Sequence, residues 1–392
     1  MPEQAVEKYR KWEQEQALTE LGRAVLKADR GPLPGDPGKP VEVAIANMDW
    51  LLRAQACSKS QDGGVARDFD LRTGWAPSYP ETTGYIIPTL LDGAVRFGRD
   101  DYREAARRML DWLKAIQLPS GGFQGGRIDQ TPVVPVTFNT GQILIGLAAG
   151  VATFGADAYG EAMHGAACFL RDSLDPDGCW RSHPTPFAAP GDKAYETHVA
   201  WGLFEAERVA PGEGYGEAGQ RQVRWAISRQ LANGWFQDNC LVRPDAPLTH
   251  TIGYVLRGCI EAYRLTPDTA VLAACRRTAD ALAGCVRADG WLAGRYDRDW
   301  QPAVDYVCLT GSSQIAACFL LLDAIESNPG YVAAAQRLNQ YVRRTISLDG
   351  PPDIRGGVKG SHPVDGDYGD YQYLNWAAKF TADAQLMEAD RR

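Results

Sequence analysis

Two histidines and several acids occupy places in the sequence where proton transfer is possible. His198 and His250 each follow a threonine at the start of an apolar segment rich in Gly and Ala, and the chain has only five histidines. Imidazole exchanges a proton near neutral pH. Glu196 lies two residues before His198, and Glu81 has the matching place in an earlier segment. A carboxyl group enclosed by protein can have a raised pKa and act as an acid. The predicted catalytic residues are His198, His250, Glu81, Glu196, Asp305 and Tyr306.

A second group of side chains has the chemistry to hold a substrate. Aromatic rings can stack on a sugar, cationic groups can bind a carboxylate, and amides can bind hydroxyls. Helix caps and hydrogen-bonded buried histidines are the ordinary structural alternatives for both groups. The predicted substrate-binding residues are Trp75, Tyr79, Arg67, Asn139, Gln142, Trp235, Tyr254, Arg257, Lys359, Tyr373, Asn375 and Lys379.

Six glycine turns divide the chain into repeats that must position these residues. Their first glycines are at 63, 121, 178, 234, 290 and 356, with steps of 56 to 58 residues and a last step of 66. A fixed period of this kind is typical of repeat architectures. The extra residues of the last repeat fall in Lys359–Tyr373, where Asp and Tyr alternate with Gly. We interpret this stretch as a mobile lid, with a solvated surface loop as the alternative.

Each turn lies between two kinds of predicted helix. The segment before it is amphipathic, as in Asp101–Gln117, where Tyr102, Ala106, Met109 and Leu113 recur at helical spacing. The segment after it is apolar nearly all round, which is typical of a helix buried on every side. Six such pairs predict an all-α (α/α)6 toroid over residues 41–392, with six inner helices ringed by six outer ones. Residues 1–40 are predicted to form an N-terminal arm of one helix, about Glu3–Lys27, and a Pro-rich linker.

Composition excludes several classes of function. The net charge of −8 gives no general attraction to nucleic acid or anionic lipid, and no stretch is apolar for long enough to span a membrane. Residues 1–27 are charged throughout and lack the apolar core of a secretory signal, and the nine cysteines contain no C-x-x-C pair. We therefore expect free thiols and a cytoplasmic location. No H-E-x-x-H motif, zinc-spaced cluster or nucleotide-binding glycine loop is present, so neither a metal nor a cofactor is expected. The oligomeric state stays open.

Some strings resemble known toroid families. Gln117-Leu-Pro-Ser-Gly-Gly-Phe123 and Gln230-Leu-Ala-Asn-Gly-Trp-Phe236 resemble the Gln/Trp repeat of squalene cyclases and protein prenyltransferase β subunits. The segment that starts at Cys308 also looks like a prenyltransferase inner helix. The chemistry of those families is not implied, because Val304 stands where the zinc histidine is expected and no D-x-D-D motif exists.

A resemblance over almost the whole chain is to bacterial proteins encoded with exopolysaccharide genes. It is carried by strings such as Trp75–Pro88, Pro247–Tyr254, Tyr306–Gly311, Arg355–Ser361 and Asn375–Phe380. The resemblance implies a glycan context rather than a particular reaction. Sugar 2-epimerases, unsaturated glucuronyl hydrolases, uronyl C5-epimerases and polysaccharide lyases share the same toroid form, which is an analogy of fold.

The sequence therefore predicts an enzyme that acts on an acidic saccharide in a central funnel. Hydrolysis would use two carboxylates, Glu81 with Glu196 or Asp305. Elimination or epimerisation would use His198, His250 or Tyr306 to remove a proton next to a carboxylate. Hydrolysis or elimination ranks slightly above epimerisation. The alternatives are a terpenoid cyclase or prenyltransferase relative, favoured by aromatic walls with one isolated acid, and a non-catalytic glycan-binding protein of polysaccharide assembly.

Overall fold

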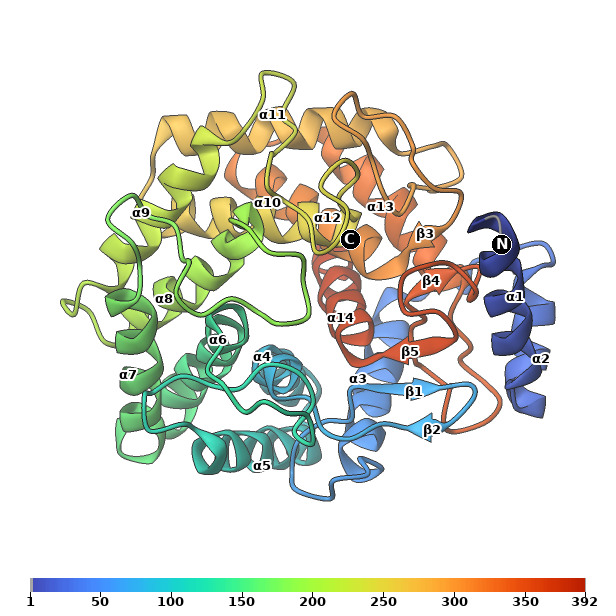
Figure 1. The fold of residues 1–392 in the computed structure, drawn as a ribbon, viewed down its shortest axis with the longest axis horizontal. Helices are drawn as coiled ribbons and strands as arrows, with labels where there is room; N and C mark the ends of the chain where they lie inside the picture. Colours follow the sequence, from blue (N-terminus) through green and yellow to red (C-terminus); the bar gives the residue numbers. More distant parts are fainter. Residues whose placement is uncertain (1–2, 392) are drawn as a thin grey trace.

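The computed structural model describes residues 3–391 and is built mainly of helices arranged as a ring (Figure 1). The outer helices are α3 (Pro40–Ala56), α5 (Asp100–Ile116), α7 (Ala156–Asp172), α9 (Tyr215–Ser228), α11 (Thr269–Cys285) and α13 (Pro329–Arg344). The inner helices are α4 (Pro80–Phe97), α6 (Thr137–Phe154), α8 (Thr197–Val209), α10 (Thr249–Leu265), α12 (Leu309–Ile325) and α14 (Asn375–Ala389).

The ring is closed by contacts between its first and last helices. Each inner helix packs against the next one, and α14 packs against both α4 and α3 at the start of the series. Figure 1 shows the inner helices around a common axis with the outer helices outside them. The (α/α)6 toroid predicted from the repeat is confirmed, and side chains from distant repeats become neighbours at its centre.

The two kinds of helix differ in burial as their sequences predict. On α5, Tyr102, Ala106, Met109 and Leu113 are buried while Arg107 on the other face is exposed. On α12 every residue from Leu309 to Leu320 is buried. An inner helix is covered by two inner neighbours and its outer partner, so it needs small and apolar side chains on all sides.

The six glycine turns fix the spacing between neighbouring repeats. Each first glycine has a positive φ, and at all of them except Gly63 an added Cβ would come within 2.5 Å of a carbonyl oxygen of the next outer helix; at Gly63 the distance would be 3.3 Å. At Gly234 the clash would be with Arg277 O at 2.5 Å. At Gly356 it would be with Ala46 O on α3, so the last turn packs against the first outer helix. Only glycine combines this backbone conformation with so close an approach.

Five short strands lie near the first and last repeats. Strand β1 (Asp68–Asp70) pairs with β2 (Gly74–Trp75) and β5 (Gln372–Leu374), and β3 (Val307–Cys308) pairs with β4 (Ser361–His362). Strand β4 and the first two residues of β5 belong to the segment 359–373. This segment is therefore tied to the ring by pairings at both of its ends, rather than hanging freely over it as a mobile lid.

The N-terminal arm contains two helices where one was expected. Helix α1 (Glu3–Gln16) is followed by α2 (Glu20–Asp29) because Thr19 caps α2. The Thr19 hydroxyl accepts from Gly22 N at 3.1 Å and donates to Leu71 O at 2.7 Å, which ends the first helix and anchors the arm. Val25 and Leu26 of α2 are buried against the ring.

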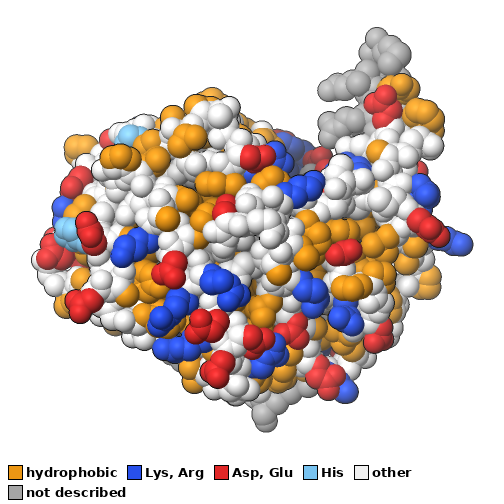
Figure 2. All heavy atoms as spheres, turned by 90° about the horizontal axis from the view of Figure 1, so that it is seen from below, with side chains coloured by type: hydrophobic (Ala, Val, Ile, Leu, Met, Phe, Trp, Pro, Cys, Tyr) orange, Lys and Arg blue, Asp and Glu red, His pale blue; other side chains and the backbone are white. Residues whose placement is uncertain are grey.

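The surface carries both signs of charge. Figure 2 shows Lys and Arg interspersed with Asp and Glu on the face it presents, rather than one extended field of a single sign. Among residues 3–391, no helix is both long and apolar enough to cross a lipid bilayer.

Candidate active site

A cavity of about 210 Å³ lies where the first residues of four inner helices converge. It collects residues from repeats one, two, three, four and six. Its walls are Arg67, Tyr79, Glu81, Tyr85, Phe138, Asn139, Thr185, Phe187, Ala188, Tyr195, Leu241, His250, Tyr254, Tyr368 and Trp376. We call this space the central cavity. Six residues of the two predicted groups line it: Glu81, His250, Arg67, Tyr79, Asn139 and Tyr254.

Among the residues that the structure describes, Glu81 is the one whose carboxyl group lines the central cavity. It stands in the first turn of α4. Its Oε2 accepts from Asn139 Nδ2 at 2.9 Å and from the Tyr79 hydroxyl at 3.2 Å. Burial raises the pKa of Glu81 to about 7, although the hydrogen bond from Tyr79 and the charge of Arg67 act in the lowering direction. At neutral pH this group can therefore both give and take a proton.

Arg67 places a cation in the wall beside Glu81. Its guanidinium lies 5.0 Å from the ring centre of Trp376 and 5.8 Å from that of Tyr79. The hydrogen bonds that it makes to described side chains, to Asp68 at 2.5 Å and Gln372 at 3.2 Å, both use Nη1. Nε and Nη2 remain for an anionic ligand, because a guanidinium can donate through all three nitrogens.

His250 presents a neutral imidazole to the cavity. Its Nδ1 lies 2.7 Å from Gln314 Oε1, which can only accept, so Nδ1 carries the proton and Nε2 holds a lone pair. Burial lowers the pKa of His250 to about 4, against a raising effect of the Gln314 hydrogen bond. At neutral pH the imidazole is therefore neutral and its lone pair can accept a proton, although the lowered pKa makes it a weaker base than an ordinary histidine.

His198 lies beneath the cavity and does not line it. Its Nδ1 contacts Gln142 Oε1 at 2.5 Å, and its ring centre is 4.3 Å from that of Tyr254. Burial, reinforced by the charges of Arg257 and Lys379, holds the pKa of His198 well below its ordinary value. His198 and Gln142 therefore form a layer that supports Tyr254 from below. This agrees with the structural alternative for His198, a buried and hydrogen-bonded histidine.

Aromatic rings make up most of the remaining wall. The Tyr254 ring lies 4.3 Å from that of His250 at an angle of 48°, and the Tyr368 ring lies 5.5 Å from the same imidazole. Trp376 donates to the Tyr368 hydroxyl at 2.8 Å. Burial holds the pKa values of Tyr79, Tyr254 and Tyr368 above their ordinary value, so these phenols stay protonated and can donate hydrogen bonds.

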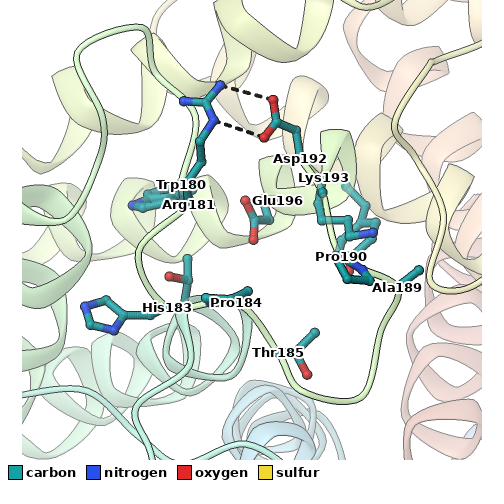
Figure 3. A pocket seen from close by; sticks show the side chains of 13 residues that line it. Trp180, Arg181, His183, Pro184, Thr185, Ala189, Pro190, Asp192, Lys193 and Glu196 are labelled. Atoms are coloured by element: carbon teal, nitrogen blue, oxygen red, sulfur yellow. Dashed lines mark hydrogen bonds and ion pairs between the residues drawn. The ribbon is translucent and has the colours of Figure 1, made fainter.

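Glu196 lies in an adjacent cavity of about 250 Å³ (Figure 3). The loop 181–193 separates the two spaces, and Thr185 and Tyr195 line both. Burial raises the pKa of Glu196 to about 8, with Asp192 acting in the same direction and Lys193 against it.

Asp305 and Tyr306 lie elsewhere, in an open pocket of about 630 Å³ beside Arg243 and the segment 359–373. Asp305 is exposed, and the Tyr306 hydroxyl accepts from Arg295 at 3.3 Å. The sequence interpretation assumed that every residue before an inner helix reaches the axis. Here Val307 and Cys308 pair with β4, which places the two preceding residues outside the central cavity.

Other predicted binding residues are engaged in the framework. Trp75 packs between Trp50 and Phe69 and donates to Asp353 at 2.9 Å, and Trp235 is buried in its glycine turn. Asn375 donates to Ala66 O at 3.0 Å, and Tyr373 pairs with Phe69 across strands β5 and β1.

Like Arg67, which pairs with Asp68, the other three predicted anion-binding cations have acidic partners. Arg257 donates to Glu261 at 2.8 Å, Lys359 to Asp29 of the arm at 2.5 Å, and Lys379 to Asp383. None of the three lines the central cavity. A buried cation needs a nearby counter-charge, and these pairings provide it within the protein.

Sequence reasoning missed several wall residues. Tyr85 lies four positions after Glu81 and so on the same face of α4, which helical periodicity could have shown. Phe138 and Trp376 are neighbours in sequence of two predicted residues, Asn139 and Asn375. The residues of the loop 181–193 carry no periodic signal that would place them in the wall.

The described residues contain no group of three or more His, Cys, Asp or Glu arranged to hold a metal ion. The nine cysteines form no disulfide; Cys57 is exposed, and most of the others are buried.

Comparison with solved structures gives the fold a wider setting. An unsaturated glucuronyl hydrolase specific for heparin superposes with a TM-score of 0.72 at 14% identity, over 90% of this chain and 97% of that chain. A D-mannose isomerase gives 0.69 at 12% identity, over 89% and 96%. A cellobiose 2-epimerase from Bacillus thermoamylovorans gives 0.68 at 12% identity, over 89% and 97%. The chain shares the toroid fold of these enzymes. No protein-family profile and no curated protein sequence matches it.

Proposed function

We propose that this protein is an enzyme that acts on an acidic saccharide by proton transfer in the central cavity. The observation that carries the proposal is the environment of Glu81, whose pKa is about 7 and whose carboxyl group accepts hydrogen bonds from Asn139 and Tyr79. This carboxyl group faces a cavity that also holds a neutral base, His250. A perturbed acid and a neutral base in one enclosed space are typical of sites for proton transfer.

The remaining walls suit a sugar ring that carries a carboxylate. The Nε and Nη2 of Arg67 can bind the anion, while Tyr79, Tyr254 and Trp376 offer stacking faces and donors for hydroxyl groups. A volume of about 210 Å³ lies below the range of roughly 300–1,000 Å³ that is usual for larger ligands. The space therefore fits one sugar residue better than an extended chain.

The arrangement favours proton removal next to the carboxylate over hydrolysis by two carboxylates. His250 Nε2 would take the proton from the carbon beside the carboxylate, while Arg67 stabilises the negative charge that develops there. In elimination, protonated Glu81 gives its proton to the departing glycosidic oxygen and the electron pair becomes a double bond. In epimerisation, Glu81 returns a proton to the other face of the same carbon. A two-carboxylate mechanism needs both acids across one bond, whereas Asp305 and Glu196 line other spaces.

A terpenoid cyclase or prenyltransferase activity is the second candidate. The walls of the central cavity are aromatic, and one of the described residues that line it is an acid. A carbocation would, however, have to form near the guanidinium of Arg67, which like-charge repulsion opposes. The phenols and the arginine fit an anionic sugar better than an isoprenoid. A protein that only binds glycan would retain binding but show no turnover.

The test is incubation with a panel of uronic-acid oligosaccharides in D2O, followed by NMR and ultraviolet absorbance. The resemblance to proteins encoded with exopolysaccharide genes makes fragments of bacterial exopolysaccharides the first substrates to include. A new carbon–carbon double bond marks elimination, deuterium uptake without cleavage marks epimerisation, and new reducing ends without a double bond mark hydrolysis. Conversion of an isoprenoid diphosphate instead of any saccharide would overturn the proposal.

A further inference from the structure

The cavity around Glu196 is a second enclosed space whose chemistry the proposed reaction does not use. It is lined by Thr137 and by residues of the loop 181–193 and the turn that follows it (Figure 3). We call it the loop cavity. Trp180, Pro184, Ala189 and Pro190 give it apolar faces, and the Glu196 carboxyl points into it.

The Glu196 carboxyl group is buried but has an oxygen without a hydrogen-bond partner in the protein, which is unusual. The residue is only 6% exposed, and its Oε2 has no hydrogen-bond partner among the described residues. Leaving a buried polar atom unpaired is unfavourable, so such atoms generally have a ligand or an ordered water as partner. Because Glu196 lines the cavity, a bound molecule can supply a hydrogen bond to the carboxyl through Oε1, the oxygen that the protein does not seal off.

Arg181 and Lys193, the two Arg or Lys side chains of the described lining, already make hydrogen bonds within the protein. Arg181 at one end of the loop binds Asp192 at the other end at 3.0 Å, and it also binds Asp175 and Asp177, each at 2.9 Å. Lys193 donates to Cys240 O at 3.2 Å. Lys193 has no acidic partner among the described residues, but its ammonium already donates to Cys240 O, so the space suits a neutral, hydroxyl-rich molecule better than an anion.

The loop that walls the cavity belongs to repeat three and is fixed to repeats two and four. His183 O accepts from Thr137 N at the start of α6 at 3.0 Å, Ala189 N donates to Leu241 O at 2.7 Å, and Ala194 N donates to Asp238 O at 2.8 Å. The Arg181–Asp192 ion pair also joins the two ends of the loop. The loop is therefore a fixed wall between the two cavities and not a loose surface segment.

The two cavities share part of their walls. Thr185 and Tyr195 line both, and the Tyr195 hydroxyl is close enough to Glu81 and Glu196 for both carboxyls to raise its pKa, after the larger effect of burial. A molecule with two linked rings can therefore contact one carboxyl with each ring.

On the basis of the proposed function, we infer that the loop cavity is a binding site for a neutral sugar residue joined to the acidic residue in the central cavity. The substrate is then at least a disaccharide. Its charged ring is held by Arg67, and its neutral ring packs on Trp180 and the prolines and bonds to Glu196. Glu196 acts here as a binding residue that positions the substrate and not as an acid or base in the reaction.

The test compares the affinities of two probes by isothermal titration calorimetry on the full chain. The probes are glucuronic acid and a disaccharide of glucuronic acid and glucose, prepared with the acid at either end. The Glu81→Gln variant serves as background so that the probes are not converted during the titration. We expect one of the disaccharides to bind about tenfold more tightly than glucuronic acid, which corresponds to a few well-placed contacts.

Variants of the loop cavity must remove this advantage selectively. Glu196→Ala is expected to abolish most of the tenfold preference while leaving the Kd of glucuronic acid unchanged, and Glu196→Gln, which keeps an amide donor, to retain more of it. Ala189→Phe, which narrows the cavity from the side of the loop, should give the same selective loss. Glu161→Gln, a change at an exposed position on α7, is the matched control and should alter neither affinity.

The outcomes separate this inference from the proposed function. If glucuronic acid binds in a manner that depends on Arg67 but neither disaccharide binds more tightly, the loop cavity is not a sugar site and the proposed function stands. A loss of both affinities to the same extent in Ala189→Phe would likewise overturn the inference. If no uronic acid binds to the wild-type chain, the proposed function itself fails.

Discussion

Burial in the central cavity moves the pKa of an acid and of a base in opposite directions. The pKa of Glu81 rises to about 7 and that of His250 falls to about 4, because burial disfavours the charged form of each. Between these values the acid is protonated and the base is neutral at the same time. One physical cause therefore prepares both partners of a proton transfer, and the two pKa values set the pH range in which they can work.

The activity is accordingly expected to show a bell-shaped dependence on pH. The kcat/KM should fall below a pH of about 4, where His250 becomes protonated, and above about 7, where Glu81 ionises. The measurement is initial rates across the pH range with a substrate found in the panel. Glu81→Asp is expected to move the alkaline limb while leaving the acid limb in place. If the alkaline limb of the profile stayed in place in Glu81→Asp, the assignment of that limb to Glu81 would be wrong.

Glu196 also gives a prediction about stability. The pKa of its carboxyl is about 8 in the folded chain, above its ordinary value of 4.5, so the folded state holds the proton more tightly. The contribution is complete below about pH 4.5 and is lost as the pH rises through about 8, and a shift of this size corresponds to about 5 kcal/mol. Urea unfolding at several pH values should show Glu196→Gln with a flatter decline than the wild type. Identical slopes for the two proteins would contradict this environment for Glu196.

At the scale of elements, the glycine turns decide how closely the repeats stack. Gly234→Ala would place a Cβ 2.5 Å from Arg277 O at a φ of +87°. We expect it to lower the free energy of unfolding by roughly 2–5 kcal/mol, from backbone strain and overpacking together. The control is Gly284→Ala on the exposed side of α11, where nothing lies within 4 Å, and a gain of about 0.5–1 kcal/mol is expected. Equal effects of the two changes in denaturant titrations would show that the turn is not a close contact.

The N-terminal arm gives a second prediction at this scale. Lys359, expected from the sequence to bind substrate, instead joins Asp29 of α2 to the last repeat, and Asp29 also accepts from Val364 N at 2.9 Å. Lys359→Ala should therefore loosen the arm and speed proteolysis near residues 17–40, while KM for an acidic saccharide stays the same. A raised KM with an unchanged cleavage pattern would restore the original assignment.

The sequence allowed the elements to be predicted better than the positions of single side chains. The glycine period and the contrast between amphipathic and fully apolar helices predicted the ring, because packing in a toroid demands that pattern from each repeat. They did not reveal that β3 and β4 carry Asp305 and Tyr306 away from the axis, since two-residue strands leave no pattern. The partners of Arg257 and Lys379 lie four residues further along the same helices, so helical periodicity could have shown them. The pairing of Lys359 with Asp29 could not be predicted, because it joins segments far apart in the sequence.

At the scale of the whole molecule, closure of the ring is what creates the site. Glu81 comes from the first repeat, His250 from the fourth, and Tyr368 and Trp376 from the sixth, yet all four line one cavity. The contacts of α14 with α3 and α4 bring the sixth repeat beside the first. The same closure sets the loop cavity beside the central one, so that a substrate of two rings can span both.

The most direct measurement is product NMR of uronic-acid oligosaccharides incubated in D2O with four proteins: wild type, Glu81→Gln, His250→Gln and the surface control Glu161→Gln. We expect the wild type and the control to convert a saccharide at equal rates, with elimination or with deuterium at the carbon beside the carboxylate. The two cavity variants should lose at least about a hundredfold in rate, as is usual when a general acid or base is removed. Full activity in both cavity variants would show that the chemistry does not take place between Glu81 and His250.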